Sequence, residues 1–146
     1  MITEPAPLEP VVIEIEVPVT PERAWSAVTD PVEVSEWFAD VTPADGVGSP
    51  YRIDFGDGSA VEGRIKVLDD GQRLAYTWTW ADEEGGPTTL VTWEVEPTGD
   101  GAGSRIRITH DGWAEAGADE DTRDDHADYW DSYLESLEEF LAAGAT

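Results

Sequence analysis

The stretch that decides the fold is residues 120–143, EDTRDDHADYWDSYLESLEEFLAA. Apolar or aromatic side chains recur in it every three or four residues, and many positions before and between them are acidic; the recurring set is His126, Trp130, Leu134, Leu137 and Leu141. This spacing puts the set on one face of an α-helix. The pattern predicts a long helix over about 120–143 that packs against another layer through this single stripe.

The chain before this helix alternates between apolar and polar residues, as strands do. The alternation predicts strands over 11–17, 51–55, 59–68, 73–81, 88–97 and 104–110. Turns rich in glycine and aspartate separate most of them, which is typical of hairpins. One face of these strands is aromatic or aliphatic and the other carries charged residues and threonine. We therefore expect an antiparallel sheet with one solvent-facing side and one side covered by the helices.

Two short helices are predicted between the first two strands. Thr20-Pro21 and Asp30-Pro31 each combine a helix-capping residue with proline at the first helical position. Glu33 follows Asp30 at the spacing of a capping box. Residues 40–50 contain two prolines and two glycines and are predicted to form a loop.

Length and composition suggest one domain with an unusual charge. Residues 1–10 contain three prolines and predict a flexible N-terminal arm, which leaves 11–146 as a single domain. The chain has 33 acidic residues against 8 basic ones, a net charge of −25. Such a surface repels nucleic acids and anionic membranes, so neither is an expected partner.

The same charge suggests where the protein works. Molar salt shortens the Debye length to about 3 Å and screens the repulsion among acidic residues. The sequence has no cysteine, no long apolar run and no basic leader followed by an apolar stretch. We expect a cytoplasmic protein of a salt-adapted prokaryote, with an ordinary acidic bacterial protein as the alternative.

Aromatic side chains of the covered sheet face and the helix stripe are the candidate binding residues. Trp80 and His126 share these faces, and the predicted ligand-binding set is Trp37, Phe38, Phe55, Tyr76, Trp78, Trp93, His110, Trp130 and Tyr133. Apolar walls with a few polar groups are typical of small-ligand cavities, although the same residues could simply fill a core. No catalytic motif or metal-ligand spacing stands out, so no catalytic residue, metal or cofactor is predicted.

Several segments, taken in order, resemble a known family. They are VPVTPERAW at 17–25, TDP at 29–31, WF at 37–38, SRIRITHDGW at 104–113 and WDSYLESL at 130–137. Together they resemble the family related to the activator of heat-shock protein 90 ATPase, in the START-like or birch-pollen-allergen-like (SRPBCC) superfamily. The resemblance implies an α+β helix-grip fold. In that fold a curved antiparallel sheet of about six strands wraps a long C-terminal helix, and two short helices follow strand one.

The resemblance also implies a cavity beneath the last helix, but no single activity. Members of the superfamily bind lipids, hormones or polyketide intermediates, and a few are enzymes. We expect binding of a small apolar or amphipathic molecule without catalysis. One alternative is a polyketide cyclase or dehydratase-like enzyme that uses His110, with Tyr76 or Tyr133. Another is a co-chaperone-type interaction module, although eukaryotic co-chaperones carry an additional N-terminal domain for which we expect no room here.

Overall fold

A single antiparallel sheet and three helices make up the described part of the chain. The computed structural model describes residues 9–42, 46–81, 88–113, 116–118 and 120–143. The elements in chain order are β1 Val11–Val17, α1 Pro21–Thr29, α2 Pro31–Trp37, β2 Asp40–Val41, β3 Pro50–Asp54, β4 Ala60–Asp69, β5 Arg73–Trp80, β6 Thr89–Thr98, β7 Gly103–Asp111 and α3 Glu120–Ala143.

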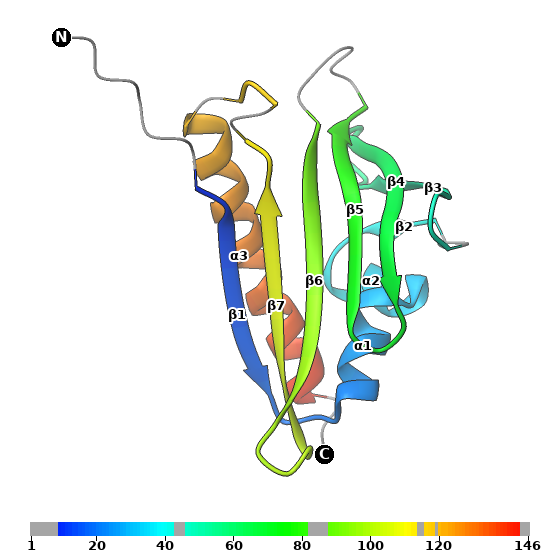
Figure 1. Cartoon of the computed structure of the whole chain (residues 1–146), viewed down its shortest axis with the longest axis vertical. Helices are drawn as coiled ribbons and strands as arrows, with labels where there is room; N and C mark the ends of the chain where they lie inside the picture. Colours follow the sequence, from blue (N-terminus) through cyan, green and yellow to red (C-terminus); the bar gives the residue numbers. More distant parts are fainter. Residues whose placement is uncertain (1–8, 43–45, 82–87, 114–115, 119, 144–146) are drawn as a thin grey trace, which may run out of the picture.

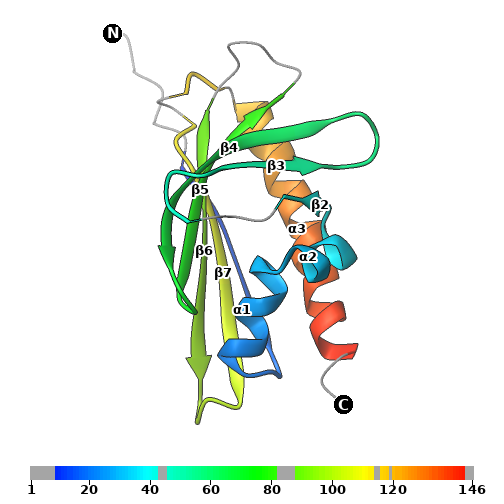
Figure 2. The same cartoon turned by 90° about the vertical axis from the view of Figure 1, so that its right-hand side faces the viewer.

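The sheet curls around the long helix. Its seven strands lie in the order β1-β7-β6-β5-β4-β3-β2, so the first strand pairs with the last. In Figure 1 α3 runs behind β1 and β7. The quarter turn in Figure 2 shows β3 and β4 bending across the upper part of α3, with α1 and α2 on the same side of the sheet as α3. The predicted helix-grip architecture, with two short helices after strand one, is confirmed.

The sheet has one strand more than the sequence predicts. Residues 40–50 are predicted to be a loop, but Asp40 and Val41 form β2 and pair with Asp54 and Ile53 of β3. A two-residue strand has no room for an alternating pattern, so pairing with a distant strand is the only thing that defines it.

Both short helices begin where their caps predict. The Thr20 hydroxyl oxygen accepts a hydrogen bond from the Arg23 backbone N–H at 3.3 Å, and proline follows it. The Asp30 carboxylate accepts from the Val32 N–H at 3.0 Å, again just before a proline. Each cap satisfies an N–H group that the first helical turn leaves unpaired.

The predicted capping box at the second helix is wrong. The Asp30 backbone N–H donates to the Ser26 carbonyl oxygen of α1 at 2.9 Å, so it has no need of Glu33. The Glu33 carboxylate instead accepts hydrogen bonds from the Arg23 guanidinium and the Ser26 hydroxyl. Because α2 starts directly after α1, the nearest donors for Glu33 belong to α1, and the contact holds the two helices together.

The curl of the sheet has local causes in β4. The pairing of β4 with β5 shifts between Ile65 and Val67, which is a bulge that bends the strand. Nearby, the Thr77 hydroxyl of β5 accepts from the Arg64 backbone N–H at 2.9 Å, and the Thr77 carbonyl accepts from the Tyr51 hydroxyl. These hydrogen bonds fix how closely β5 approaches β4. Strand β5 carries Trp78 and Trp80.

The concave side of the sheet and one face of α3 form the core. The buried residues of α3 are the predicted stripe of His126, Trp130, Leu134, Leu137 and Leu141. They face fully buried residues of four strands: Ile53, Val61, Trp93, Ile106, Ile108 and His110. The predicted covered face and helix stripe are therefore confirmed as the two halves of one core.

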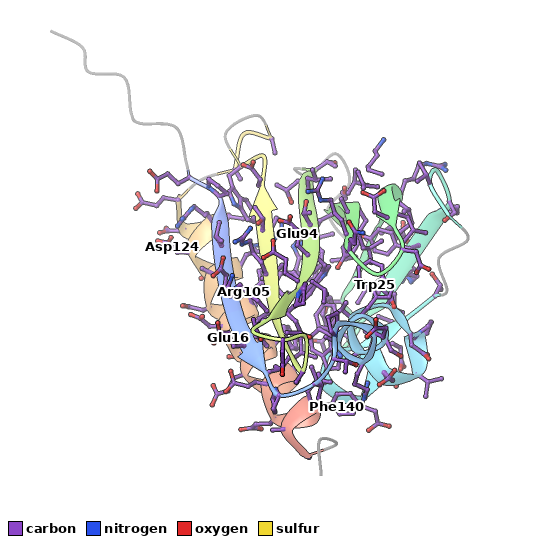
Figure 3. The ribbon with its side chains drawn as sticks, turned by 60° about the horizontal axis from the view of Figure 1, so that its bottom comes forward. Glu16, Trp25, Glu94, Arg105, Asp124 and Phe140 are labelled. Atoms are coloured by element: carbon purple, nitrogen blue, oxygen red, sulfur yellow. The ribbon has the colours of Figure 1, made fainter. Side chains whose placement is uncertain are left out.

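The convex side of the sheet is polar and paired. Arg105 of β7 lies within 3.2 Å of the Glu16 carboxylate of β1 and 3.8 Å of Glu96 on β6. Arg107 makes the same kind of bridge between Glu14 and Glu94. Figure 3 labels Glu16, Arg105 and Glu94, one from each of these three neighbouring strands. Acidic strands thus flank a basic one on this face.

The predicted N-terminal arm lies mostly outside the described residues. The two that are described, Glu9 and Pro10, are exposed, and Arg123 of α3 donates to their carbonyl oxygens at 2.5 and 3.4 Å. None of the helices in the described ranges is long and apolar enough to cross a membrane.

Candidate functional site

The His110 ring is held at the centre of the core by two hydrogen bonds. Its side chain is fully buried on β7. The indole N–H of Trp130 on α3 donates to His110 Nδ1 at 2.9 Å, so Nδ1 carries no proton. The proton therefore sits on Nε2, which lies 2.5 Å from the Thr89 hydroxyl oxygen. That hydroxyl can in turn donate to the Trp78 carbonyl at 3.5 Å.

A second indole–imidazole pair runs in the opposite direction. Trp80 of β5 donates its indole N–H to Nε2 of His126 on α3 at 3.0 Å. The other ring nitrogen of His126 lies 2.7 Å from the carbonyl oxygen of Thr122, one helical turn earlier. Sheet and helix each supply one tryptophan and one histidine. The two pairs fix how α3 rests on the sheet.

The two histidines lie close together and His110 is neutral. Their ring centroids are 5.3 Å apart. Burial, reinforced by the nearby His126, lowers the pKa of His110 from 6.5 to about 2. Both ring nitrogens of His110 are in use, which leaves no free position for proton transfer. Within the described ranges no three His, Asp or Glu side chains gather as metal ligands.

A cavity of about 170 Å³ opens between β5, the turn after β3 and the first half of α3. Its walls are mainly aromatic, and the lining residues are Phe55, Asp57, Ser59, Trp78, Trp80, His126, Tyr129, Trp130 and Tyr133. Engineered apolar cavities of about 150 Å³ accept benzene. The space therefore suits one ring or a compact group of similar size.

Trp78 adds an unusual polar feature to the cavity wall. Its ring is buried, and its indole N–H has no hydrogen-bond partner among the described residues. A buried donor without a partner costs about 1–3 kcal/mol relative to a paired one. The other tryptophan donors near it, those of Trp80 and Trp130, are both paired with histidines.

The open edge of the cavity carries a negative charge. Asp57 accepts hydrogen bonds from the Ser59 hydroxyl at 2.5 Å and the Ser59 backbone N–H at 2.9 Å, and these bonds lower the pKa of the Asp57 carboxyl. The pKa of Tyr133 is raised, first by burial and then by the charge of Asp57. Tyr133 therefore stays a neutral phenol beside a carboxylate.

A second cavity of about 50 Å³ lies between α2 and the sheet. Trp37, Phe38, Tyr76 and Trp93 are among its walls. Trp93 donates its indole N–H to the Tyr76 hydroxyl at 2.9 Å, and Trp37 donates to the Ala27 carbonyl at 2.8 Å. Burial also raises the pKa of Tyr76. Its polar groups are largely satisfied within the protein, and its volume leaves room for little more than a water or two.

The structure divides the predicted site residues into three groups. Phe55, Trp78, Trp130 and Tyr133 line the larger cavity, and Trp37, Phe38, Tyr76 and Trp93 line the smaller one. His110 lines neither and lies behind Trp78, with ring centroids 5.4 Å apart. Phe38 also connects the two groups, because its ring lies 4.6 Å from Tyr133 and 5.4 Å from Trp130.

Sequence reasoning did not single out three residues of the larger cavity. Tyr129 lies one turn before Tyr133 on α3, so its spacing from Tyr133 was a usable signal. Asp57 and Ser59 sit in a glycine-rich turn, where polar residues are expected for turn formation alone. This turn lies next to α3 only because the sheet bends.

The fold and the cavity define a class of protein. A curved antiparallel sheet that grips a long C-terminal helix, with aromatic side chains between them, is the helix-grip architecture of START-like domains. The comparison with protein families agrees, because residues 18–142 match the family described as activator of Hsp90 ATPase homolog 1-like protein. The chain belongs to this family.

Solved structures with the same fold come from several sources. DynU16, from the dynemicin biosynthetic locus, is 25% identical with a TM-score of 0.81; the match covers 94% of this chain and 49% of DynU16. This chain thus spans about half the length of DynU16. A protein from Mesorhizobium loti is 24% identical with a TM-score of 0.79, and 91% of this chain and 96% of that one are covered.

A third neighbour shares the family's name. The Aha1 dimer from Colwellia psychrerythraea is 21% identical with a TM-score of 0.77, and the match covers 95% of this chain and 100% of that one. At this identity the likeness concerns the fold. The comparison with curated proteins found no match.

Proposed function

We propose that this protein binds a small apolar or amphipathic molecule in the 170 Å³ cavity beneath α3. The observation that carries the proposal is a cavity of about 170 Å³ with mainly aromatic walls between the sheet and α3. A ligand with a ring-sized apolar part suits this space. The buried part of the ligand is small, because drug-sized pockets measure about 300–1,000 Å³.

The polar contacts of His110 favour binding over acid–base catalysis. A general base needs a free ring nitrogen within reach of substrate. In His110 one nitrogen accepts from Trp130 and the other faces Thr89, and the side chain lines neither cavity. The cyclase or dehydratase alternative therefore gains no support from this residue.

The distribution of exposed apolar side chains gives little support to a co-chaperone-type module. A protein-binding surface would be expected to present a contiguous apolar patch. In the described ranges the exposed large apolar residues come from six different segments: Val12, Val32, Val47, Leu68, Leu90 and Tyr129.

The proposal can be tested with p-cresol, a single ring that carries one hydroxyl acceptor. We expect p-cresol in molar KCl to shift the indole N–H signals of Trp78, Trp80 and Trp130 in a proton–nitrogen correlation spectrum. The indoles of Trp25 and Trp113 line neither cavity and serve as internal controls. Shifts spread evenly over all the tryptophans, or none at all, would count against a ligand site in this cavity.

A further inference from the structure

We infer that the group held in the larger cavity is an organic cation, a quaternary or methylated ammonium. This inference rests on the proposed function and specifies the chemistry of its ligand. The observation behind it is an enclosure of aromatic rings from the turn after β3, from β5 and from α3, with a single carboxylate, Asp57, at its edge. An aromatic enclosure of this kind attracts ammonium groups because the face of each ring is electron-rich.

The ring planes favour a compact group over a flat one. The ring of Phe55 lies at 28° to the ring of Tyr133 and at 34° to the ring of Trp80, so it is closer to parallel with these two rings than with Trp78. Trp78 is turned by 61° from Phe55 and by 88° from Trp80. A flat ligand can stack on only one of these two orientations. A tetrahedral ammonium group can contact rings of both orientations at once.

The size of the cavity agrees with this chemistry. A trimethylammonium group with a two-carbon chain has about as many heavy atoms as benzene, which fits engineered cavities of about 150 Å³. The larger cavity, at about 170 Å³, holds a group of this size, and the 50 Å³ cavity does not.

Charge selects a cation over an anion. Of the nine lining residues none is lysine or arginine, and His126 uses its ring nitrogens in hydrogen bonds to Trp80 and Thr122. Asp57 is therefore the only charged side chain on the described wall. An anionic ligand would meet repulsion from this carboxylate at the edge of the cavity.

The test compares choline with its uncharged isostere, 3,3-dimethyl-1-butanol, in which carbon replaces nitrogen. Both are titrated in molar KCl against the indole signals of Trp78 and Trp80. We expect choline to bind at least about tenfold more tightly than the isostere, as a desolvated cation–π contact implies. Because the two probes share shape and hydroxyl, the difference reports the charge alone.

Two variants locate the effect in the cavity. Asp57→Asn should weaken choline about two- to threefold, because molar KCl screens an exposed carboxylate in part, and should leave the isostere unchanged. Asp100→Asn is the matched control, since Asp100 also accepts a backbone N–H two residues on in a glycine-rich turn but lines neither cavity. Tyr133→Leu should weaken choline about tenfold while the isostere retains its affinity, because leucine keeps an apolar wall but removes the ring face.

The outcomes distinguish the inference of a cationic ligand from the proposal that the cavity binds a small molecule. Equal binding of choline and the isostere, with no effect of Asp57→Asn, would overturn the inference of a cationic ligand and leave the proposal of small-molecule binding intact. The same holds if p-cresol shifts the cavity tryptophans and choline does not. If none of the three probes shifts these tryptophans, both the inference and the proposed function fall.

Discussion

Each of the two tryptophan–histidine pairs links α3 to the sheet by one hydrogen bond, with one partner on the helix and the other on a strand. Trp130 and His110 form one pair, and Trp80 and His126 form the other. In each pair the neutral imidazole accepts the indole N–H, so protonation of the ring would place two donors face to face. The neutral state of these histidines is therefore part of the fold, and His110 serves to position Trp130 at the cavity wall.

The buried His110 predicts a pH dependence of stability. The unfolded chain binds a proton at His110 below about pH 6.5, whereas the folded protein resists it until about pH 2. The contribution is complete above pH 6.5 and is lost progressively as the pH falls from 6.5 towards 2. Urea melts in molar KCl should show the free energy of unfolding falling by up to about 1.4 kcal/mol per pH unit below 6.5.

The interval from pH 7.5 to 5.5 avoids most carboxylate titration, because carboxyl groups ordinarily titrate at lower pH. Nitrogen spectra of the imidazoles separate His110 from His126: His110 should keep its proton on Nε2 throughout. An imidazole signal of His110 that titrates near pH 6.5 in the folded protein would contradict the buried, neutral assignment.

At the scale of elements, the distance between β4 and β5 determines the shape of the larger cavity. A side-chain Cβ placed on Gly63 would lie 2.1 Å from the Thr77 carbonyl oxygen. Thr77 directly precedes Trp78, so the position of this strand determines where the cavity wall stands. Glycine is required here by close backbone approach rather than by a special backbone angle.

Gly63→Ala should therefore destabilise the protein by about 1–3 kcal/mol through overpacking against backbone. Urea melts would measure the loss, and the Trp78 and Trp80 indole signals should move as β5 shifts. Lys66→Ala, at an exposed position of the same strand, is the control and should change stability by less than about 0.5 kcal/mol. A Gly63→Ala protein as stable as this control would show that β4 and β5 can separate freely.

At the scale of the whole molecule, repulsion among acidic residues competes with local ion pairs. Arg105 and Arg107 bridge acidic strands on the convex face, but such exposed pairs contribute only about 0–1 kcal/mol each. Salt weakens these pairs, yet it also screens an excess charge of −25. The second effect involves many more charges, so salt should stabilise the molecule. We propose on this basis that the protein is adapted to high salt.

Thermal melts in KCl test this proposal. Raising KCl from about 0.1 M to 1 M shortens the Debye length from about 10 to 3 Å and should raise the melting temperature by at least about 5 °C. A variant with four exposed carboxylates of α3 neutralised should respond less: Asp128→Asn, Asp131→Asn, Glu135→Gln and Glu138→Gln. Equal melting temperatures at both salt concentrations would refute the proposal.

The sequence by itself determined the elements and their faces. Helix and strand periods follow from backbone geometry within a few residues, so the stripe from His126 to Leu141 and the covered strand face could be predicted correctly. The helix caps at Thr20 and Asp30 could be predicted for the same reason, because each cap pairs with an N–H group two or three residues further along the chain. The capping box at Glu33 failed because its real partners belong to the neighbouring helix.

Only the tertiary structure decided which aromatic residues surround a space. Trp78 and Trp93 have the same inward parity, yet one lines the 170 Å³ cavity and the other the 50 Å³ cavity. The packing of α3 on the curved sheet places Asp57 and Tyr133 at one cavity and His110 beside His126. A cavity is what remains after distant elements have packed. No pattern within one segment can specify it, because each of its walls comes from a different part of the chain.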